Sequence, residues 1–343
     1  MAETNTYIKP FVVLALVLVL VFLANISLGS VSIPLKDVLN SLFGGTIQNE
    51  SWDYIIQNYR IPKAFTAIIV GSGLGISGLL MQTLFRNPLA GPFVLGISSG
   101  ASLGVAFVIM GASLFGGAIS GMLITKWSLV VAASLGSFLV LLTVLVVSSR
   151  VRDTMAILII GLMFASITAA IVSVLSYFAT ADELQQYVFW GFGSLGNLSW
   201  NELLVLLSVY LVGLVLSVFS IKALNSLLLG ENYAKSLGMN LRRNRLIIIL
   251  ATSLLAGTIT AFAGPIAFIG LAAPHVTKLV LKTSDHRIVL PVAAVVGAFI
   301  MLISDTIAQL PGSEYTLPIN AITTLFGAPI VISLLVRKRR MVL

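Results

Sequence analysis

The stretch from Gly71 to Ala101 decides the fold of this chain and reads GSGLGISGLLMQTLFRNPLAGPFVLGISSGA. Its apolar start predicts a helix that carries Gly71, Gly75 and Gly78 on one face, because their spacings are four and three residues. Small residues at this spacing let helix backbones approach closely in lipid, where burial of apolar surface does not drive association. The turn at 86–92, RNPLAGP, is too polar for the bilayer centre. We therefore expect two membrane helices joined at an aqueous face.

Composition places the whole chain in a membrane. Of the 343 residues, 58% are hydrophobic and only 9% are charged, which excludes an ordinary soluble domain. A helix needs about 20 apolar residues to cross a bilayer, so the chain has enough for roughly ten spans. No second type of composition occurs along the chain. The sequence therefore predicts one all-α integral membrane domain over residues 1–343.

Ten apolar segments are candidates for these spans. The first has the shape of a signal peptide too, but Lys9 is its only preceding cation and no A-x-A cleavage site follows, so we expect an uncleaved helix. Between the spans, 29–62 is predicted to be aqueous, 179–200 to lie at an interface, and 222–245 to be a polar cytoplasmic segment. The predicted spans are 11–24, 64–85, 93–111, 127–148, 154–178, 201–221, 246–263, 266–281, 288–308 and 317–336.

The basic residues predict the orientation. With ten spans and a cytoplasmic N-terminus, 16 of the 20 Lys and Arg residues fall on the inner side, as the positive-inside rule requires. Only Lys36, Arg60, Lys63 and Lys126 remain outside. The net charge of +8 then reflects contact with anionic lipid and gives no reason to expect nucleic acid. Both termini are expected in the cytoplasm.

Two segments of the chain echo each other weakly. Ala90-Gly91-Pro92 opens the third predicted span from the inside, and Ala263-Gly264-Pro265 opens the eighth from the outside. Inverted repeats of this kind are common in transporters. Three matched residues leave chance open as the alternative.

Motifs of catalysis and metal binding are absent or lie in the wrong context. No P-loop, G-x-x-x-x-G-K-[ST], occurs, so another chain or an ion gradient must supply the energy of any transport. The G-x-S-x-G match at 96–100 lies in a membrane helix and lacks the preceding strand of a nucleophile elbow. His275 and His286 with one nearby carboxylate do not make a metal site. Asp305 is the best candidate for a functional carboxylate within the membrane, although its place near a helix end should let it reach water.

Five blocks of sequence resemble one known family. GISGLLMQTLFRNPLAGPFVLGISSGA (75–101) resembles the signature of the FecCD-type permeases, the membrane subunits of ABC importers for iron-siderophores and cobalamin. The resemblance covers most of the chain after residue 55, in the family's order. The remaining blocks are RIPK (60–63), LLLGENYAKSLGM (227–239), AGPIAFIGLAAPHVTKL (263–279) and LFGAPIVISLL (325–335).

The resemblance implies a fold, a function and partners. The fold would be that of a type II importer permease like the cobalamin permease, without a cofactor or enzymatic activity of its own. The cargo would be an iron(III)-siderophore, with cobalamin or haem as alternatives. Partners would be a cytoplasmic ATPase dimer, an extracytoplasmic binding protein and a second permease, identical or paralogous, in a bacterial cytoplasmic membrane. An ion-coupled secondary transporter is the alternative of another class, disfavoured because acidic residues lie almost wholly at the ends of spans.

The resemblance also implies an ATPase contact in the segment 227–238. Without it, an ordinary cytoplasmic loop would be the preferred interpretation. On a short helix Ala234 and Leu237 would share a face, since they are three residues apart. The family's coupling helices match this segment. The implied coupling residues are Gly230, Glu231, Ala234, Leu237 and Gly238.

Two further roles follow from the resemblance. Arg60 and Lys63 match the cations that face the binding protein, although paired cations at a membrane edge are usually anchors. Thr154 and Met155 match the cytoplasmic gate, although a helix cap is equally compatible. The chain departs from the family's outer pattern in its residues Gln309, Thr316 and Asn320, which weakens the docking assignment.

Overall fold

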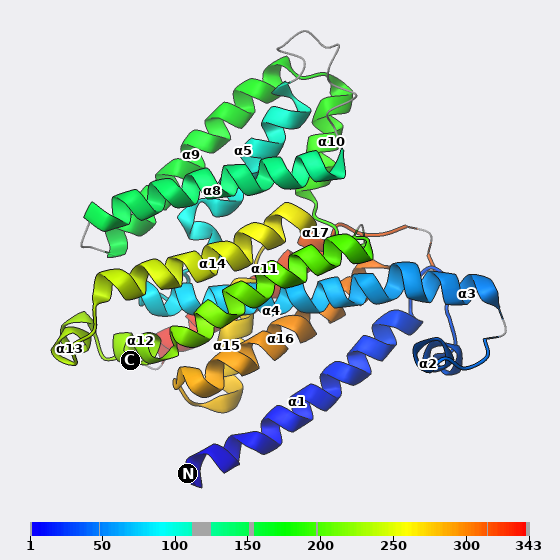
Figure 1. Ribbon diagram of the computed structural model, residues 1–343, viewed down its shortest axis with the longest axis horizontal. Coiled ribbons are helices and arrows are strands. Elements are labelled where there is room, and N and C mark those ends of the chain that lie inside the picture. The colour runs from blue at the N-terminus through cyan, green and yellow to red at the C-terminus, as the bar shows by residue number, and fades with distance from the viewer. Residues whose placement is uncertain are drawn as a thin grey trace. The chain divides into compact units, whose positions relative to one another are not determined.

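Helices make up every regular element of the computed structural model, which describes residues 2–47, 49–111, 125–150, 154–196, 198–313 and 315–340 (Figure 1). The all-α prediction is confirmed. The longer helices are α1 (Ala2–Ser27), α4 (Ile61–Leu84), α8 (Lys126–Arg150), α9 (Thr154–Phe178), α11 (Trp200–Phe219), α14 (Leu241–Ala263), α16 (His286–Ala308) and α17 (Ile319–Arg340). The shorter helices are α2 (Leu35–Phe43), α3 (Glu50–Ile55), α5 (Ile97–Ile109), α10 (Ala181–Gly191), α12 (Ile221–Leu228), α13 (Glu231–Ser236) and α15 (Ile269–Leu281).

Apolar helices coincide with all ten predicted spans within these described ranges. Six are long and apolar enough to cross a membrane, and four more are apolar but shorter. The long ones are Glu50–Leu84, Lys126–Val147, Met155–Phe178, Trp200–Phe219, Leu241–Ala263 and His286–Ala308. The shorter ones are Phe11–Ser27, Ile97–Ile109, Ile269–Leu281 and Ile319–Ser333.

The third and eighth predicted spans start later than expected. Their helices, α5 and α15, have 13 residues each, about 20 Å of helix, which is less than the roughly 30 Å of a bilayer core. Left-handed residues begin both helices: Gly96 has φ 75° before α5, and Phe268 has φ 66° before α15. A reversal of φ cannot be part of a right-handed helix, so the Pro92–Leu95 turn is a separate 3₁₀ element.

The left-handed Phe268 is supported by its neighbours. A bulky residue at positive φ is strained unless the surrounding structure holds it. The Asn320 side chain of α17 accepts a hydrogen bond from the Ala267 amide at 3.1 Å. A Cβ at Gly327 would lie 2.3 Å from the Phe268 Cβ, so only glycine leaves room there. Asn320 thus has a structural task at a position where the chain departs from the family pattern.

The segment 29–62, predicted to be an aqueous stretch, is largely helical. It contains α2, α3 and a π-helical turn, Ile56–Arg60, and helix continues without a break from Glu50 to Leu84. Two features favour the helix at its start. The Asn49 side chain accepts from the Ser51 amide as an N-cap, and the Trp200 indole donates to the Gln57 carbonyl at 3.1 Å. Polarity alone did not distinguish this helix from a loop.

The chain's internal contacts divide it into two compact units, and the single-domain expectation stays a prediction. Unit 1 comprises Met1–Ile76, Ser194–Ser208 and Ile266–Leu343, and unit 2 comprises Ser77–Gly193 and Val209–Pro265. The two AGP segments precede α5 of unit 2 and α15 of unit 1. Helices α5 and α15 have equal length, and each begins after a left-handed residue, so the similarity of the two AGP segments extends to the helices that follow them. The inverted orientation of these two segments stays a prediction.

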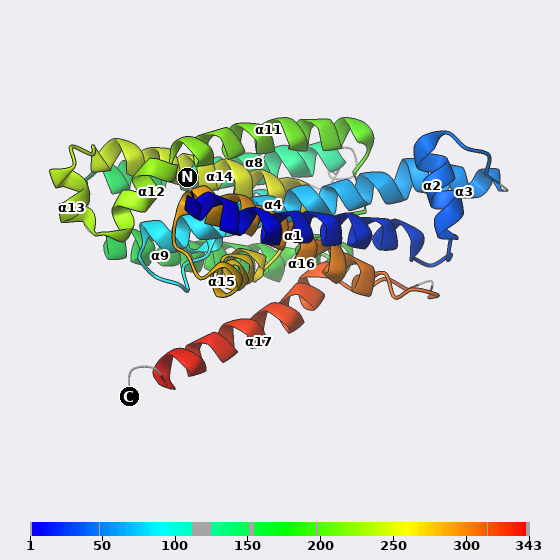
Figure 2. The ribbon, with the colours of Figure 1, turned by 90° about the horizontal axis from the view of Figure 1, so that it is seen from below.

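Glycine contacts hold the helices of unit 1 together. A Cβ at Gly71 of α4 would lie 2.3 Å from the carbonyl oxygen of Gly297 in α16, and one at Gly297 would lie 2.2 Å from that of Gly71. Gly75 is similarly close to the Ala293 carbonyl. In the same unit α1 lies along α16, while the C-terminal half of α17 diverges from α15 and α16 (Figure 2). The close backbones stabilise the contact through van der Waals packing.

Unit 2 uses the same kind of contact between α5 and α8. A Cβ at Gly136 would lie 2.0 Å from the Gly100 carbonyl, and one at Gly104 would lie 2.1 Å from the Ala132 carbonyl. Helices α9 and α10 pack on the same α5. A capping box at Thr180 and Glu183 starts α10, since each side chain binds the other residue's amide.

Candidate functional site: coupling segment, outer cations and gate

The predicted coupling segment contains two short helices, α12 and α13. Gly230, at φ 107°, separates them, and Gly238, at φ 79°, follows α13. Both backbone conformations favour glycine, because a side chain is strained there. An ion pair at 3.2 Å between Glu231 and Arg245 ties the first residue of α13 to α14. The segment therefore forms a corner of two short helices joined by a turn and held to α14 by an ion pair, and not an extended loop.

Ala234 and Leu237, which the sequence predicts to share a face of the helix, differ in burial. Ala234 is fully buried within the chain, whereas Leu237 is 60% exposed. The Leu237 amide still donates to the Tyr233 carbonyl at 3.2 Å, so the helical turn reaches Leu237 and the difference lies in what covers the two side chains. Leu237 is one of three exposed apolar side chains within or next to α13 in the sequence, together with Leu229 at 64% and Tyr233 at 50%. We call these three residues the α13 patch.

The polar turn at 86–92 approaches this corner. Arg86, itself at φ 50°, brings its guanidinium to 3.8 Å from where a Cβ of Gly230 would lie. The Asn87 side chain holds the turn by accepting from the Leu89 amide at 2.9 Å. Two of the five blocks that resemble the family, 75–101 and 227–239, thus approach each other through Arg86 and Gly230, which both belong to unit 2.

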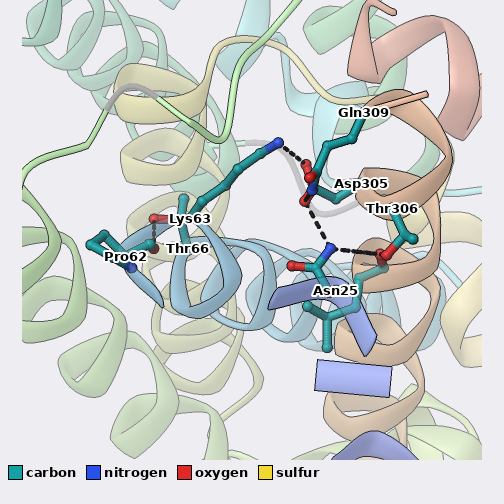
Figure 3. A network of polar contacts seen from close by, with 8 residues as sticks. Asn25, Pro62, Lys63, Thr66, Asp305, Thr306 and Gln309 are labelled. Carbon is teal, nitrogen blue, oxygen red and sulfur yellow. Dashed lines mark hydrogen bonds and ion pairs between the residues drawn. The ribbon is translucent and has the colours of Figure 1, made fainter. Parts of the chain in front are cut away.

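Lys63 belongs to a polar network in unit 1, drawn in Figure 3. Its ammonium lies 3.1 Å from Asp305 Oδ1. The other oxygen, Oδ2, accepts from Asn25 Nδ2 at 2.9 Å and from Gln309 Nε2 at 2.7 Å. Asn25 also donates to Thr306 Oγ1 at 2.9 Å. Each oxygen of the carboxylate therefore has a partner from the protein.

The structure contradicts the expectation that Asp305 reaches water. Asp305 is only 2% exposed. Its place near the end of α16 does not lead to solvent, because α1 and α4 supply Asn25 and Lys63 to cover it. A buried charge is costly unless it is paired and hydrogen-bonded, and this one is. Asn25, the first polar residue after the apolar run of α1, was a signal for this network that the sequence reasoning missed.

Arg60 has a different set of partners. It is 9% exposed, and its guanidinium donates to the carbonyls of Ile26 at 2.6 Å, Ser27 at 2.9 Å and Val31. Ile26 and Ser27 end α1, where unpaired carbonyls and the helix dipole favour a cation. Gly29 leaves the room for it, since a Cβ there would lie 3.0 Å from Arg60 Nη2. The two cations predicted to act together thus have separate partners inside the chain.

The predicted gate lies at the start of α9. Thr154 is the first residue of that helix, and Met155 is 50% exposed. The side chain of Thr154 and residues 151–153, which include the alternative cap Asp153, lie outside what the structure describes.

Comparison with known proteins decides the family. The model of the FecCD transport family matches residues 16–337. The chain belongs to the FecCD transport family. The hemin transport system permease protein HmuU of Yersinia pestis is 35% identical over 328 residues, covering 95% of each chain. The vitamin B12 import system permease protein BtuC of Klebsiella pneumoniae is 36% identical over 285 residues, covering 83% of each.

A solved structure has the same fold. The inward-facing conformation of a metal-chelate type ABC transporter superposes with a TM-score of 0.82 at 30% identity, covering 97% of this chain and all of that one. This FecCD-family member is therefore a multi-pass membrane permease of an ABC importer and not itself an enzyme. Family membership also decides against the ion-coupled secondary transporter.

Proposed function

We propose that this FecCD-family permease imports an iron(III)-siderophore delivered by an extracytoplasmic binding protein. The observation that carries the choice of cargo is the similarity over nearly the whole chain to a metal-chelate type transporter. Haem and cobalamin are the alternatives, because HmuU and BtuC share about a third of their residues with this chain. All three cargoes are bulky metal chelates, so a binding protein, rather than the pathway, would supply most of the specificity.

An uptake assay tests the cargo. The permease, reconstituted with its copurified ATPase and binding protein, is given a ⁵⁵Fe-labelled ferric trihydroxamate, cobalamin or haem in separate vesicles. The proposal expects ATP-dependent accumulation of the ferric chelate. Accumulation of cobalamin or haem alone would reject the siderophore and keep the importer.

The ATPase dimer would dock on the α13 patch. Exposed apolar side chains gathered beside a charged helix are typical of a protein interface. The α13 patch, Leu229, Tyr233 and Leu237, presents such a surface on a corner braced by Glu231 and Arg245. Ala234 would act indirectly, by letting α13 pack against its own chain. Gly230 and Gly238 would act through the turns that they allow.

Two charge insertions separate docking from folding. Leu237→Asp places a carboxylate on the α13 patch and should release the ATPase while the permease keeps its membrane yield. Asn232→Asp is the matched control, since Asn232 is exposed on the same helix but is not part of the patch. Ala234→Asp should lower the yield itself, because it buries an unpaired charge. A normal ATPase complex with Leu237→Asp would remove this docking surface.

Docking of the binding protein by Arg60 and Lys63 remains a proposal that must compete with their internal contacts. Lys63 is the better candidate, because its side chain is 22% exposed whereas Arg60 is 9% exposed. A rim charge acts mainly on the association rate and its salt dependence. Lys63→Glu should therefore slow association with the binding protein at low ionic strength, and an unchanged rate would leave Lys63 as a structural residue.

A second permease subunit would complete the pathway, with Thr154 and Met155 at the cytoplasmic gate. The chain has no cysteine, so a disulfide between two Met155→Cys copies reports their proximity directly. Cross-linked homodimers would support a gate between identical subunits. A complex that contains a paralogous permease and forms no cross-link would reject the homodimer.

A further inference from the structure

Unit 2 contains a cleft lined by six residues with hydroxyl groups and three apolar residues. Its volume is about 360 Å³, within the roughly 300–1,000 Å³ typical of ligand pockets. Helices α5, α9 and α10 form it. None of its lining residues is charged. The hydroxyl groups belong to Ser98, Ser99, Ser102, Thr168, Ser173 and Tyr187, and the other lining residues are Ala165, Ala169 and Val172.

Thr168 is the decisive residue in this cleft. It is 5% exposed, and its hydroxyl makes no hydrogen bond with any residue that the structure describes. A threonine or serine within a helix commonly donates to the carbonyl four residues back. Ser166, two residues earlier on α9, does so, donating to Leu162 at 3.1 Å. Among the described residues, the buried side-chain oxygens that lack a partner do not include that of Thr168, so its hydroxyl is open to the cleft that it lines. It can therefore donate to, or accept from, a polar group that enters the cleft.

Other hydroxyl groups line the same cleft as Thr168. Ser102 and the Tyr187 hydroxyl lie 2.5 Å apart, one from α5 and the other from α10. Ser98 lies one helical turn before Ser102, so both lie on one face of α5. Ala169 and Ser173 are exposed at the rim. Donors from three helices thus converge on one open-sided space.

We propose that this cleft is a binding subsite for uncharged oxygen-bearing groups of the transported chelate. Hydroxyl groups can both donate to and accept from amide, hydroxamate and ester oxygens. The absence of charge among the lining residues disfavours a bare metal ion or a free carboxylate, which need charged or multiple anionic partners. The inference deepens the proposed function and rests on it, because it names the part of the cargo that the permease itself contacts.

Cysteine protection tests occupancy of the cleft without relying on transport. Because the chain has no cysteine, Ser173→Cys gives one thiol at the rim of the cleft. Ser166→Cys is the matched control, on the same exposed stretch of α9 but outside the cleft. The permease–ATPase complex in lipid nanodiscs is labelled with a small methanethiosulfonate while a neutral ferric trihydroxamate is titrated. We expect labelling of the Ser173→Cys variant to slow along a saturation curve and labelling of the Ser166→Cys variant to stay constant.

Removal of the Thr168 hydroxyl is the second test. Thr168→Val keeps the shape and removes the donor, so the KM of chelate uptake should rise about fivefold, the effect of one neutral hydrogen bond. The KM should change more than the maximal rate. Thr168→Ser restores a hydroxyl and should restore the KM, which a purely structural role for the methyl group would not predict.

The outcomes distinguish the two proposals. The subsite proposal would be overturned if the ferric chelate is taken up but does not protect the thiol of Ser173→Cys, and Thr168→Val has a normal KM. The proposed function would then still stand. Protection of the Ser173→Cys thiol without uptake would overturn the function and keep the subsite. Labelling that changes with the nanodisc lipid but not with the chelate would assign the cleft to lipid headgroup oxygens and also overturn the proposal.

Discussion

The ion pair between Lys63 and Asp305 should stabilise unit 1 only while both partners are present. Lys63→Met keeps the apolar stem and removes the ammonium. Asp305, 2% exposed, then keeps only the amide donors Asn25 and Gln309. Breaking a buried pair costs about 3–5 kcal/mol. The two amide donors that remain and the 22% exposure of the Lys63 side chain reduce this to about 2 kcal/mol.

Replacement of both partners should cost much less than replacement of one. Asp305→Leu alone leaves the Lys63 ammonium beside an apolar side chain, again at about 2 kcal/mol. The double variant, Lys63→Met with Asp305→Leu, removes both charges, and Asn25 keeps Thr306 as a partner at 2.9 Å. Replacing both partners of a buried ion pair by apolar residues of similar size often leaves the free energy of unfolding nearly unchanged. With about 2 kcal/mol for each single variant and almost nothing for the double variant, the cycle should give a coupling energy of about 4 kcal/mol.

Thermal unfolding of the purified permease measures this coupling. At about 2 °C per kcal/mol, each single variant should lower Tm by about 4 °C, and the double variant should lie near the wild type. Lys36→Met is the control, an exposed cation predicted on the same side. If the Tm changes of the two single variants simply add in the double variant, Lys63 and Asp305 do not stabilise each other. An unchanged Tm for Lys63→Met with slower binding-protein association would show that the main partner of Lys63 lies outside the chain.

Other contacts and the predicted topology give three further tests. Gly297→Ala should cost about 1–3 kcal/mol and lower Tm, because its Cβ would lie 2.2 Å from a carbonyl oxygen of α4. Gly191→Ala is the control and should be neutral, because a Cβ there has nothing within 4 Å. Equal Tm values for the two variants would contradict the close contact at Gly297. Arg60→Lys should also lower Tm, because one ammonium cannot reach the three carbonyls that the guanidinium binds; an unchanged Tm would show that this cap contributes no stability. A single cysteine at Ser51 should be labelled from outside the cell, whereas one at Asn232 should be labelled only after permeabilisation. Labelling of the Asn232 cysteine from outside would contradict the ten-span topology.

Sequence alone located the apolar helices, because the length of an apolar run is a local property of the chain. It also predicted the close approach of α4 to a partner helix from Gly71 and Gly75, since small residues at helical spacing permit it. It did not predict where α5 and α15 begin. Their starts depend on left-handed residues, and Phe268 adopts that conformation only because Asn320 and Gly327 accommodate it.

The partners of polar residues were decided by the tertiary structure. Arg60 and Lys63 look like one docking pair in the sequence, yet Arg60 binds the end of α1 and Lys63 binds Asp305 of α16. Thr168 likewise looks like one more small residue of an apolar helix, until α5 and α10 bring other hydroxyls beside it. Hydropathy is carried by each residue and survives in any arrangement of the chain. A hydrogen bond or ion pair exists only when folding brings two distant residues within about 3 Å, so no local pattern records it.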